Sequence, residues 1–142
     1  MEAEALPVQV KRPDEDIADD IAALIRSYPP LKQARHWFIF EVRDGVVTLR
    51  GNLKSSIACR VLLDNVPDIP GVERVVADEL YVDSDLSRRI AREADLPAGV
   101  LVSVDFGRVI LSGALPARRK AEPLVKKVAK IKGVREVLNR LV

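Results

Sequence analysis

The chain has 142 residues, of which 48% are hydrophobic and 31% charged, a balance that predicts a packed fold and excludes wholesale disorder. Its single cysteine cannot form an intramolecular disulfide, and no apolar run is long enough to predict a transmembrane segment. The N-terminus lacks a secretory signal, so we expect a cytoplasmic protein, and a periplasmic one only if a signal peptide has been removed.

The formal net charge is only +2, but the charges are unevenly distributed along the chain. Residues 1–82 hold 10 Lys or Arg against 14 Asp or Glu, a net charge of −4. Residues 83–142 hold 13 against 7, a net charge of +6. The two halves of the chain therefore have opposite signs.

Residues 1–13 form a lead-in, and the segment that follows has the pattern of an amphipathic helix. Its apolar residues Ile17, Ile21 and Ile25 recur at the spacing of one helical face. Acidic residues occupy the first turn, where carboxylates are stabilised by the positive end of the helix dipole. Pro29–Pro30 is expected to end this helix.

Alternating apolar residues in 38–42 and 47–53 predict two strands. Asp44–Gly45 lies between them and suits a two-residue hairpin turn, because both positions of a type I′ turn need positive φ. Counting outward from this turn pairs Val42 with Val47 on the inner face of the sheet.

A second helix and a last strand follow the hairpin. Residues 59–66 show helical spacing of apolar side chains, and Ser55 or Ser56 is a suitable N-cap for this helix. A Gly-Val pair then precedes a strand at residues 75–82.

The same series of elements returns 62 residues later without a gap. Residues 42–53 match residues 104–115, and residues 69–75 match residues 131–137; every identical position in these segments is Gly, Val, Leu or Ile. Because no acid, base, nucleophile or metal ligand is repeated, the repeat defines an architecture and no reaction.

The second copy predicts a first helix over residues 84–94, whose connection to the hairpin is seven residues shorter than in the first copy. Its hairpin turn is Phe106–Gly107, which places Asp105 opposite Arg108 as a cross-strand ion pair. Pro123 is expected to begin the regular part of its second helix, because proline is disfavoured farther inside a helix.

The predicted fold class is α+β, with two tandem α-β-β-α-β modules at residues 14–82 and 83–142. Each module is expected to contain a small three-stranded mixed sheet with two helices packed on one face. Gly51 and Gly113 are each expected to permit a bulge or a close helix approach. The glycines with structural roles are Gly45, Gly51, Gly71, Gly107, Gly113 and Gly133.

This order of elements, with Asp44–Leu53 and Pro70–Val75 as its sequence motifs, resembles the BON domain, a family named for bacterial osmotically induced and nodulation proteins. The second copy keeps the pattern at residues 107–113 and 133–139. Three positions depart from it: Ala77, Phe106 and Pro123.

The resemblance implies a non-catalytic module that binds phospholipid surfaces, with a link to bacterial osmotic stress. The family has no agreed catalytic residues to assign to this chain. We therefore expect neither an enzyme nor a bound cofactor.

The strongest functional signal is the basic stretch from Arg118 to Arg140, which holds nine Lys or Arg and two Glu. Positive charge at this density attracts anionic surfaces, and lipid headgroups are the favoured ligand. A solvated helix face is the alternative interpretation, and nucleic acid is disfavoured because no aromatic side chain lies among these cations. The candidate lipid- or anion-binding residues are Arg118, Arg119, Lys120, Lys126, Lys127 and Lys130.

His36 and Cys59 are each the single residue of their kind, so they predict neither a transition-metal site nor a catalytic pair. Trp37 is expected to lie in the core, and an amphipathic anchor at a membrane interface is the alternative. The acidic residues between Asp14 and Asp20 match no calcium loop. The first functional hypothesis is docking on an anionic phospholipid surface. The alternative is a protein–protein interaction or assembly module, in which the opposite charges of the two halves guide self-association or partner docking.

Overall fold

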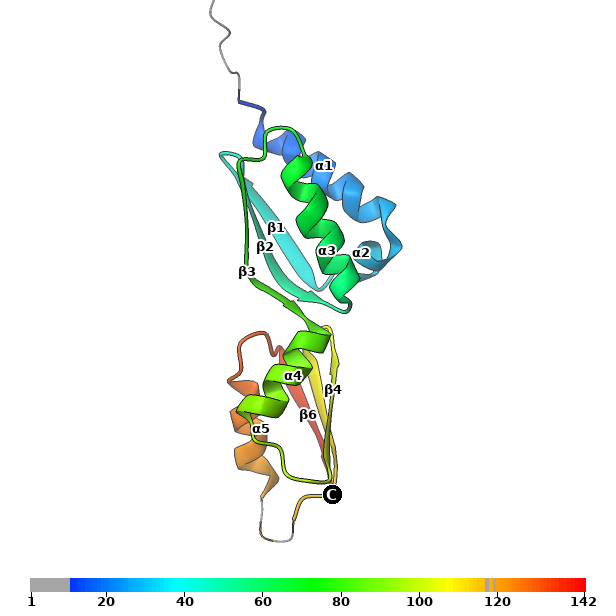
Figure 1. Cartoon of the computed structure of the whole chain (residues 1–142), viewed down its shortest axis with the longest axis vertical. Coiled ribbons are helices and arrows are strands. Elements are labelled where there is room, and N and C mark those ends of the chain that lie inside the picture. Colours follow the sequence, from blue (N-terminus) through cyan, green and yellow to red (C-terminus); the bar gives the residue numbers. More distant parts are fainter. Residues whose placement is uncertain (1–10, 117, 119) are drawn as a thin grey trace, which may run out of the picture.

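The computed structural model describes residues 11–116, 118 and 120–142 and contains two modules stacked end to end (Figure 1). Module 1 comprises α1 (Asp14–Ser27), α2 (Pro29–Ala34), β1 (Phe38–Arg43), β2 (Val46–Leu53), α3 (Ser56–Asn65), the 3-10 turn η1 (Val66–Asp68) and β3 (Arg74–Val82). Module 2 comprises α4 (Asp83–Glu93), β4 (Val100–Asp105), β5 (Arg108–Gly113), α5 (Ala121–Ala129) and β6 (Glu136–Leu141).

Each module has a three-stranded mixed sheet, in the order β1-β2-β3 or β4-β5-β6. The first two strands form an antiparallel hairpin, and the last strand runs parallel to the middle one. The predicted α+β class with two such sheets is therefore confirmed.

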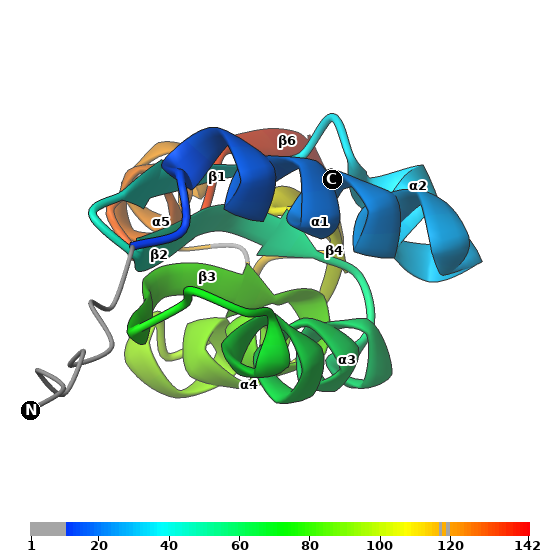
Figure 2. The ribbon, with the colours of Figure 1, turned by 90° about the horizontal axis from the view of Figure 1, so that it is seen from above.

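The helices of module 1 pack on one face of its sheet (Figure 2). Val47 and Leu49 of β2 point toward Ile17 and Ile21 of α1 and Leu62 of α3, and all five side chains are fully buried. Because residues of a strand alternate between its two faces, the same register leaves the opposite face of the sheet open to solvent.

The first hairpin has the predicted register, with Val42 opposite Val47. Its turn residues Asp44 and Gly45 have φ values of 51° and 78°, as a type I′ turn requires. The hairpin of module 2 repeats this geometry.

Module 1 contains one helix more than expected. Pro29–Pro30 follows the end of α1 at Ser27, as predicted, but Pro29 also begins α2. Proline suits the first turn of a helix because the N–H that it lacks would have no acceptor within the helix. α2 buries Leu31 and Ala34, and it accounts for the longer connection in module 1.

One carboxylate ties the first helix of module 1 to the hairpin turn. The backbone N–H groups of Asp44 and Gly45 donate to Oδ2 and Oδ1 of Asp14, at 2.8 Å and 3.1 Å. Asp14 is the first residue of α1. This contact, which we call the helix–turn clamp, fixes α1 against the end of the β1–β2 hairpin.

Module 2 repeats the helix–turn clamp with Asp83, the first residue of α4. The N–H groups of Phe106 and Gly107 donate to Oδ2 and Oδ1 of Asp83, at 2.7 Å and 3.0 Å. Burial raises the pKa of the Asp83 carboxyl, although these two hydrogen bonds act to lower it. The clamp of module 2 is thus the more enclosed of the two.

Gly51 and Gly113 each sit against the backbone at the start of the adjacent strand. Their φ values are 128° and 96°, in the region that favours glycine. A Cβ at Gly51 would overlap the backbone of Trp37 and Phe38, and a Cβ at Gly113 would overlap Gly99. The close neighbour is therefore backbone rather than a helix.

A bulge interrupts the pairing of β2 with β3. Thr48 pairs with Val76 but Arg50 pairs with Glu79, so β3 has one extra residue in this stretch. Ala77, one of the three positions that depart from the BON pattern, lies at this bulge.

The two modules meet through Phe106, the turn residue that departs from the first copy. Its ring stacks on Trp37 of module 1, with ring centroids 5.5 Å apart and planes at 16°. The guanidinium carbon of Arg135 lies 4.4 Å from the Trp37 ring centroid, and Arg135 Nη1 donates to the Phe106 carbonyl at 3.2 Å. Trp37 is 37% exposed and is a junction residue, so its expected place in the core is wrong.

Polar contacts complete this junction. Asn52 is 3% exposed, and its Nδ2 donates to the carbonyl of Gly133 at 2.8 Å. β3 ends at Val82 and α4 begins at Asp83, so no linker separates the two modules.

The expected ion pair between Asp105 and Arg108 is replaced by two others. The residues lie opposite each other in the hairpin, as predicted. However, Arg108 Nε lies 3.1 Å from Glu136 Oε1 on β6, and Asp105 Oδ1 lies 3.6 Å from Lys54 Nζ of module 1. Each charge has a partner on an element outside the hairpin, which the hairpin sequence alone does not reveal.

We predict that Asp83→Ala lowers the free energy of unfolding by about 2 kcal/mol, because two backbone N–H groups of the turn lose their acceptor. The matched variant Asp14→Ala should cost less, about 1 kcal/mol, because water reaches the exposed N–H of Asp44. Urea denaturation of both variants checks this order. Equal stability of Asp83→Ala and the wild type would contradict a supporting role for the clamp.

We predict that Gly113→Val destabilises the protein by about 3 kcal/mol or more, because valine at positive φ is strained and its side chain has no space beside Gly99. Ser112→Val on the same strand is the control, since it introduces the same side chain where β-branched residues are favoured. Thermal melting of both variants measures the difference, and similar melting temperatures would argue against the close backbone contact.

Candidate functional site

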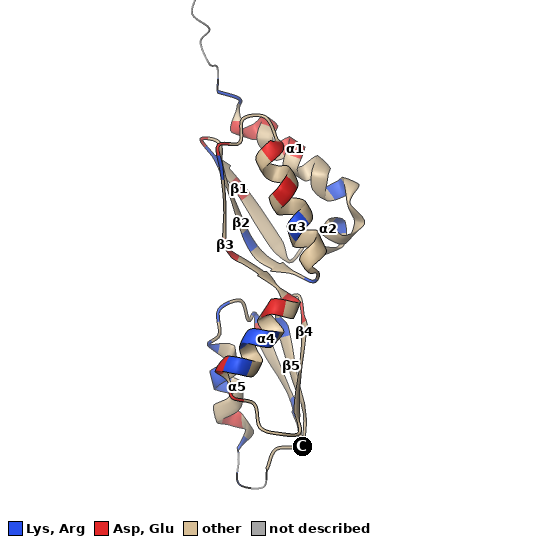
Figure 3. Cartoon of the chain, viewed as in Figure 1, with Lys and Arg blue, Asp and Glu red and all other residues tan. Residues whose placement is uncertain are grey.

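The two helices of module 2 are fixed side by side by their buried faces. Leu86 and Ile90 of α4 and Leu124 and Val128 of α5 pack into the core of module 2. The polar residues of both helices are thereby left at the surface. Figure 3 shows Lys and Arg side by side on α4 and α5.

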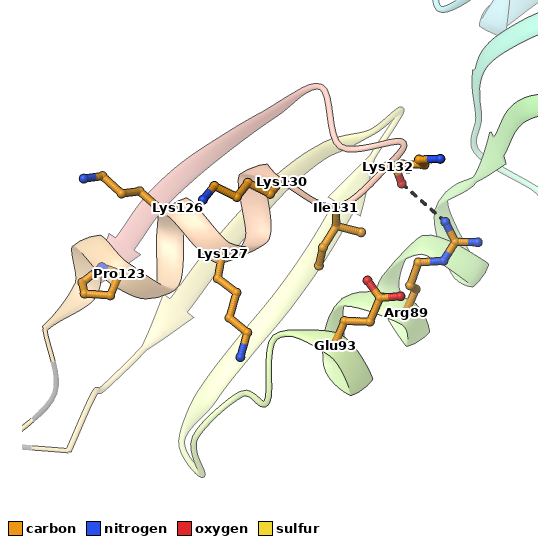
Figure 4. Close-up of a pocket in the computed structure, with 8 residues that line it drawn as sticks. All are labelled: Arg89, Glu93, Pro123, Lys126, Lys127, Lys130, Ile131 and Lys132. Atoms are coloured by element: carbon orange, nitrogen blue, oxygen red, sulfur yellow. Dashed lines mark hydrogen bonds between the residues drawn. The ribbon is translucent and has the colours of Figure 1, made fainter.

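A groove of about 680 Å³ lies between α4 and α5 (Figure 4). Five cationic side chains and a single carboxylate line it, so its charge is strongly positive. We call it the basic groove, and its lining residues are Arg89, Glu93, Pro123, Lys126, Lys127, Lys130, Ile131 and Lys132.

Most of the lysines in the basic groove are available to a ligand. Lys126 Nζ lies 3.0 Å from Glu122 Oε1 on the same helix, an exposed pair that water weakens. Lys127, Lys130 and Lys132 are exposed and form no ion pair with any residue that the structure describes. Three full positive charges therefore face solvent along one groove.

Arg89 forms the wall of the groove on α4. Its guanidinium carbon lies 5.9 Å from the ring centroid of Tyr81, and its Nη1 is 3.5 Å from the carbonyl of Lys132 (Figure 4). These contacts hold the cation at the mouth of the groove and join α4 to the loop after α5.

A second, smaller pocket of about 390 Å³ continues past the N-terminal end of α5. Arg118, Lys120 and Lys127 line it, together with Pro123, which also borders the basic groove. The two pockets are thus neighbours on one surface and share Lys127.

The structure brings together three of the six candidate residues, Lys126, Lys127 and Lys130, in the basic groove. Arg118 and Lys120 border the neighbouring pocket, and Arg119 lies outside the described residues. Lys132 and Arg89 belong to the groove but were not among the six candidates. Lys132 lies in the basic stretch, whereas only the packing of α4 against α5 brings Arg89 to this site.

Pro123 does not begin α5, which starts two residues earlier at Ala121. Pro123 still lies within the first turn, where backbone N–H groups have no acceptor inside the helix, so its ring is tolerated there. The segment between β5 and α5 is therefore shorter than expected.

The other polar candidates do not combine into a reactive site. Among the described residues, no group of three or more His, Cys, Asp and Glu is placed to hold a metal ion. Cys59 is a free, partly buried thiol whose pKa is raised by burial and by the charge of Asp85, which disfavours the reactive thiolate. None of the helices in the described part of the chain has the length and apolar character needed to cross a membrane.

Comparison with known proteins agrees with the α+β fold described above. The family model of the BON domain matches residues 78–142. This match covers module 2 and the end of β3, so the second half of the chain is a BON domain. That module 1 is a second BON domain stays a prediction, based on the sequence repeat.

Two solved structures of CdsD, a structural protein of the type III secretion system of Chlamydia trachomatis, are similar to this chain. The C-terminal domain of CdsD has a TM-score of 0.68 at 20% identity, over 91% of this chain and 66% of that one. The other structure has a TM-score of 0.41 at 16% identity, over 89% of this chain and 91% of that one. The first likeness shows a shared fold that includes both modules. No curated protein sequence matches the chain.

Proposed function

We propose that this protein is a non-catalytic binding module that docks on anionic phospholipid surfaces through the basic groove of module 2. The proposal is based on the five cations from α4, α5 and the loop after α5 that line one groove with a single carboxylate. The BON match supports a binding or assembly module, and the phospholipid ligand and a role in osmotic stress are the parts that we propose.

The electrostatic free energy that the cations of the groove contribute is suited to reversible docking. A Lys or Arg close to an anionic bilayer contributes about 1 kcal/mol. Lys127, Lys130 and Lys132 together would then contribute about 3 kcal/mol, and Arg89, Arg118 and Lys120 would add to this. Binding of this kind is weakened by salt, because exposed charges are screened beyond about 8 Å at physiological ionic strength.

The lining of the groove favours headgroups over nucleic acid. Sequence-independent binding of single strands uses aromatic side chains on which bases stack. The described lining residues include no aromatic, and Tyr81 lies behind the Arg89 guanidinium. We place the docked protein on the cytoplasmic side of the membrane, which carries the anionic lipids that such basic surfaces recognise.

The proposal predicts that the wild type co-sediments with phosphatidylserine-containing vesicles at low salt, stays in the supernatant with phosphatidylcholine vesicles, and is released as salt rises. The triple variant Lys127→Gln/Lys130→Gln/Lys132→Gln should bind the anionic vesicles about a hundredfold more weakly, because it loses about 3 kcal/mol of electrostatic attraction.

A matched control removes the same number of exposed positive charges from module 1, as Lys32→Gln/Arg43→Gln/Arg60→Gln. This variant should bind nearly as well as the wild type. If both triple variants lose binding equally, net charge rather than the groove is responsible. If the wild type ignores anionic vesicles at low salt, the lipid proposal fails.

A further inference from the structure

The face of module 1 that corresponds to the basic groove carries the opposite charge. Equivalent positions lie 62 residues apart in the hairpins and last helices, and 69 apart in the first helices, as Asp14 and Asp83 of the two clamps show. At these offsets Asp64 and Asp68 of module 1 occupy the places of Lys126 and Lys130, and Asp20 occupies that of Arg89. We call the surface of these three aspartates and Asp19 the acidic face.

The charge changes sign only at the surface, and the buried residues beneath it stay apolar in both modules. Ile21 corresponds to Ile90 and Val66 to Val128, and all four are fully buried. By contrast, Glu122 and Lys126, which form an ion pair on α5, correspond to Arg60 and Asp64 on α3, so the order of the two charges along the helix is reversed.

The anchoring contacts at the end of the two surfaces are also equivalent. In module 1, Arg12 Nη1 lies 2.7 Å from Asp20 Oδ2 and donates to the carbonyl of Pro70 at 2.9 Å. In module 2, the equivalent carbonyl is that of Lys132, which accepts from Arg89 itself. The two surfaces therefore occupy equivalent positions in their modules and have opposite sign, although Arg12 partly offsets the charge of Asp20.

The two surfaces cannot meet within one molecule. The helices of module 1 lie to the right of its sheet in Figure 1, and those of module 2 lie to the left of theirs. The view along the long axis shows the same opposition (Figure 2), and Figure 3 shows Asp and Glu on α1 and α3 and Lys and Arg on α4 and α5. A junction without a linker, packed by Phe106 on Trp37, keeps this arrangement.

We propose that the basic groove of one copy receives the acidic face of a second copy of this chain. The contact is heterologous, because different surfaces meet and the second copy retains a free basic groove on its far side. Repetition of the contact gives a head-to-tail chain or ring. This inference stands independently of the lipid proposal, and it implies that anionic vesicles compete with self-association for the basic groove.

Charge reversal tests the contact directly. Asp64→Lys/Asp68→Lys balances the two remaining aspartates of the acidic face with two lysines, and Lys126→Asp/Lys130→Asp leaves three cations and three carboxylates in the basic groove. All four residues are exposed, so both variants should keep the wild-type circular dichroism spectrum and melting behaviour. In light scattering at low salt, the mass of the wild type should rise with concentration above the 15.7 kDa of one chain, and each variant alone should stay monomeric.

An equimolar mixture of the two variants should recover association, because the basic groove of the first accepts the unchanged acidic face of the second. A wild type that remains monomeric at low salt, or an Asp64→Lys/Asp68→Lys variant that associates like the wild type, would overturn the proposal. The same variant distinguishes self-association from lipid binding. Asp64→Lys/Asp68→Lys keeps the basic groove, so it should still bind anionic vesicles.

Discussion

In each module the helix–turn clamp fixes the position of the first helix against the hairpin turn. A carboxylate at the first residue of α1 or α4 accepts two N–H groups from the hairpin turn, and so fixes the first helix of each module along its sheet. In module 2 the clamp has two further consequences. It orients α4, whose Arg89 forms one wall of the basic groove, and it holds Phe106 where its ring stacks on Trp37. Burial raises the pKa of Asp83, a sign that this carboxylate is enclosed by the turn it supports. One buried acid therefore links the groove, the sheet and the junction between the modules.

The two modules show how one frame supports two different surfaces. Duplicated positions in the core keep their apolar character, because a change of volume there is costly. Surface positions on the same helices are not constrained in this way, and several exchange Asp for Lys or Arg. The basic groove is thus a property of module 2 alone, although both modules have the same order of strands. Because the modules face opposite ways, a ligand bound at one leaves the other accessible (Figure 3).

Sequence reasoning predicted the fold well because the signals were local or repeated. The alternation of valines and the Asp44–Gly45 turn were sufficient for the hairpin register, and the repeat supplied the second module. Features that depend on tertiary packing were missed. Trp37 was expected in the core because nothing in the sequence shows that two modules stack at its ring. α2 was missed because a proline pair both ends one helix and begins another. Of the site, the lysines of α5 were predicted from charge density, whereas Arg89 comes from another helix and becomes part of the groove only through packing.

The ligand-binding chemistry that we propose for this tandem fold lies in the groove between α4 and α5. Backbone amide NMR spectra provide the test, recorded on the wild-type chain diluted until it is monomeric, with increasing amounts of phosphatidylserine nanodiscs. We expect signal changes to begin at Arg89 and at residues 126–132, while amides of α1 and α3 stay unchanged. Equal changes on α1 and α3, or changes confined to the open faces of the sheets, would contradict it.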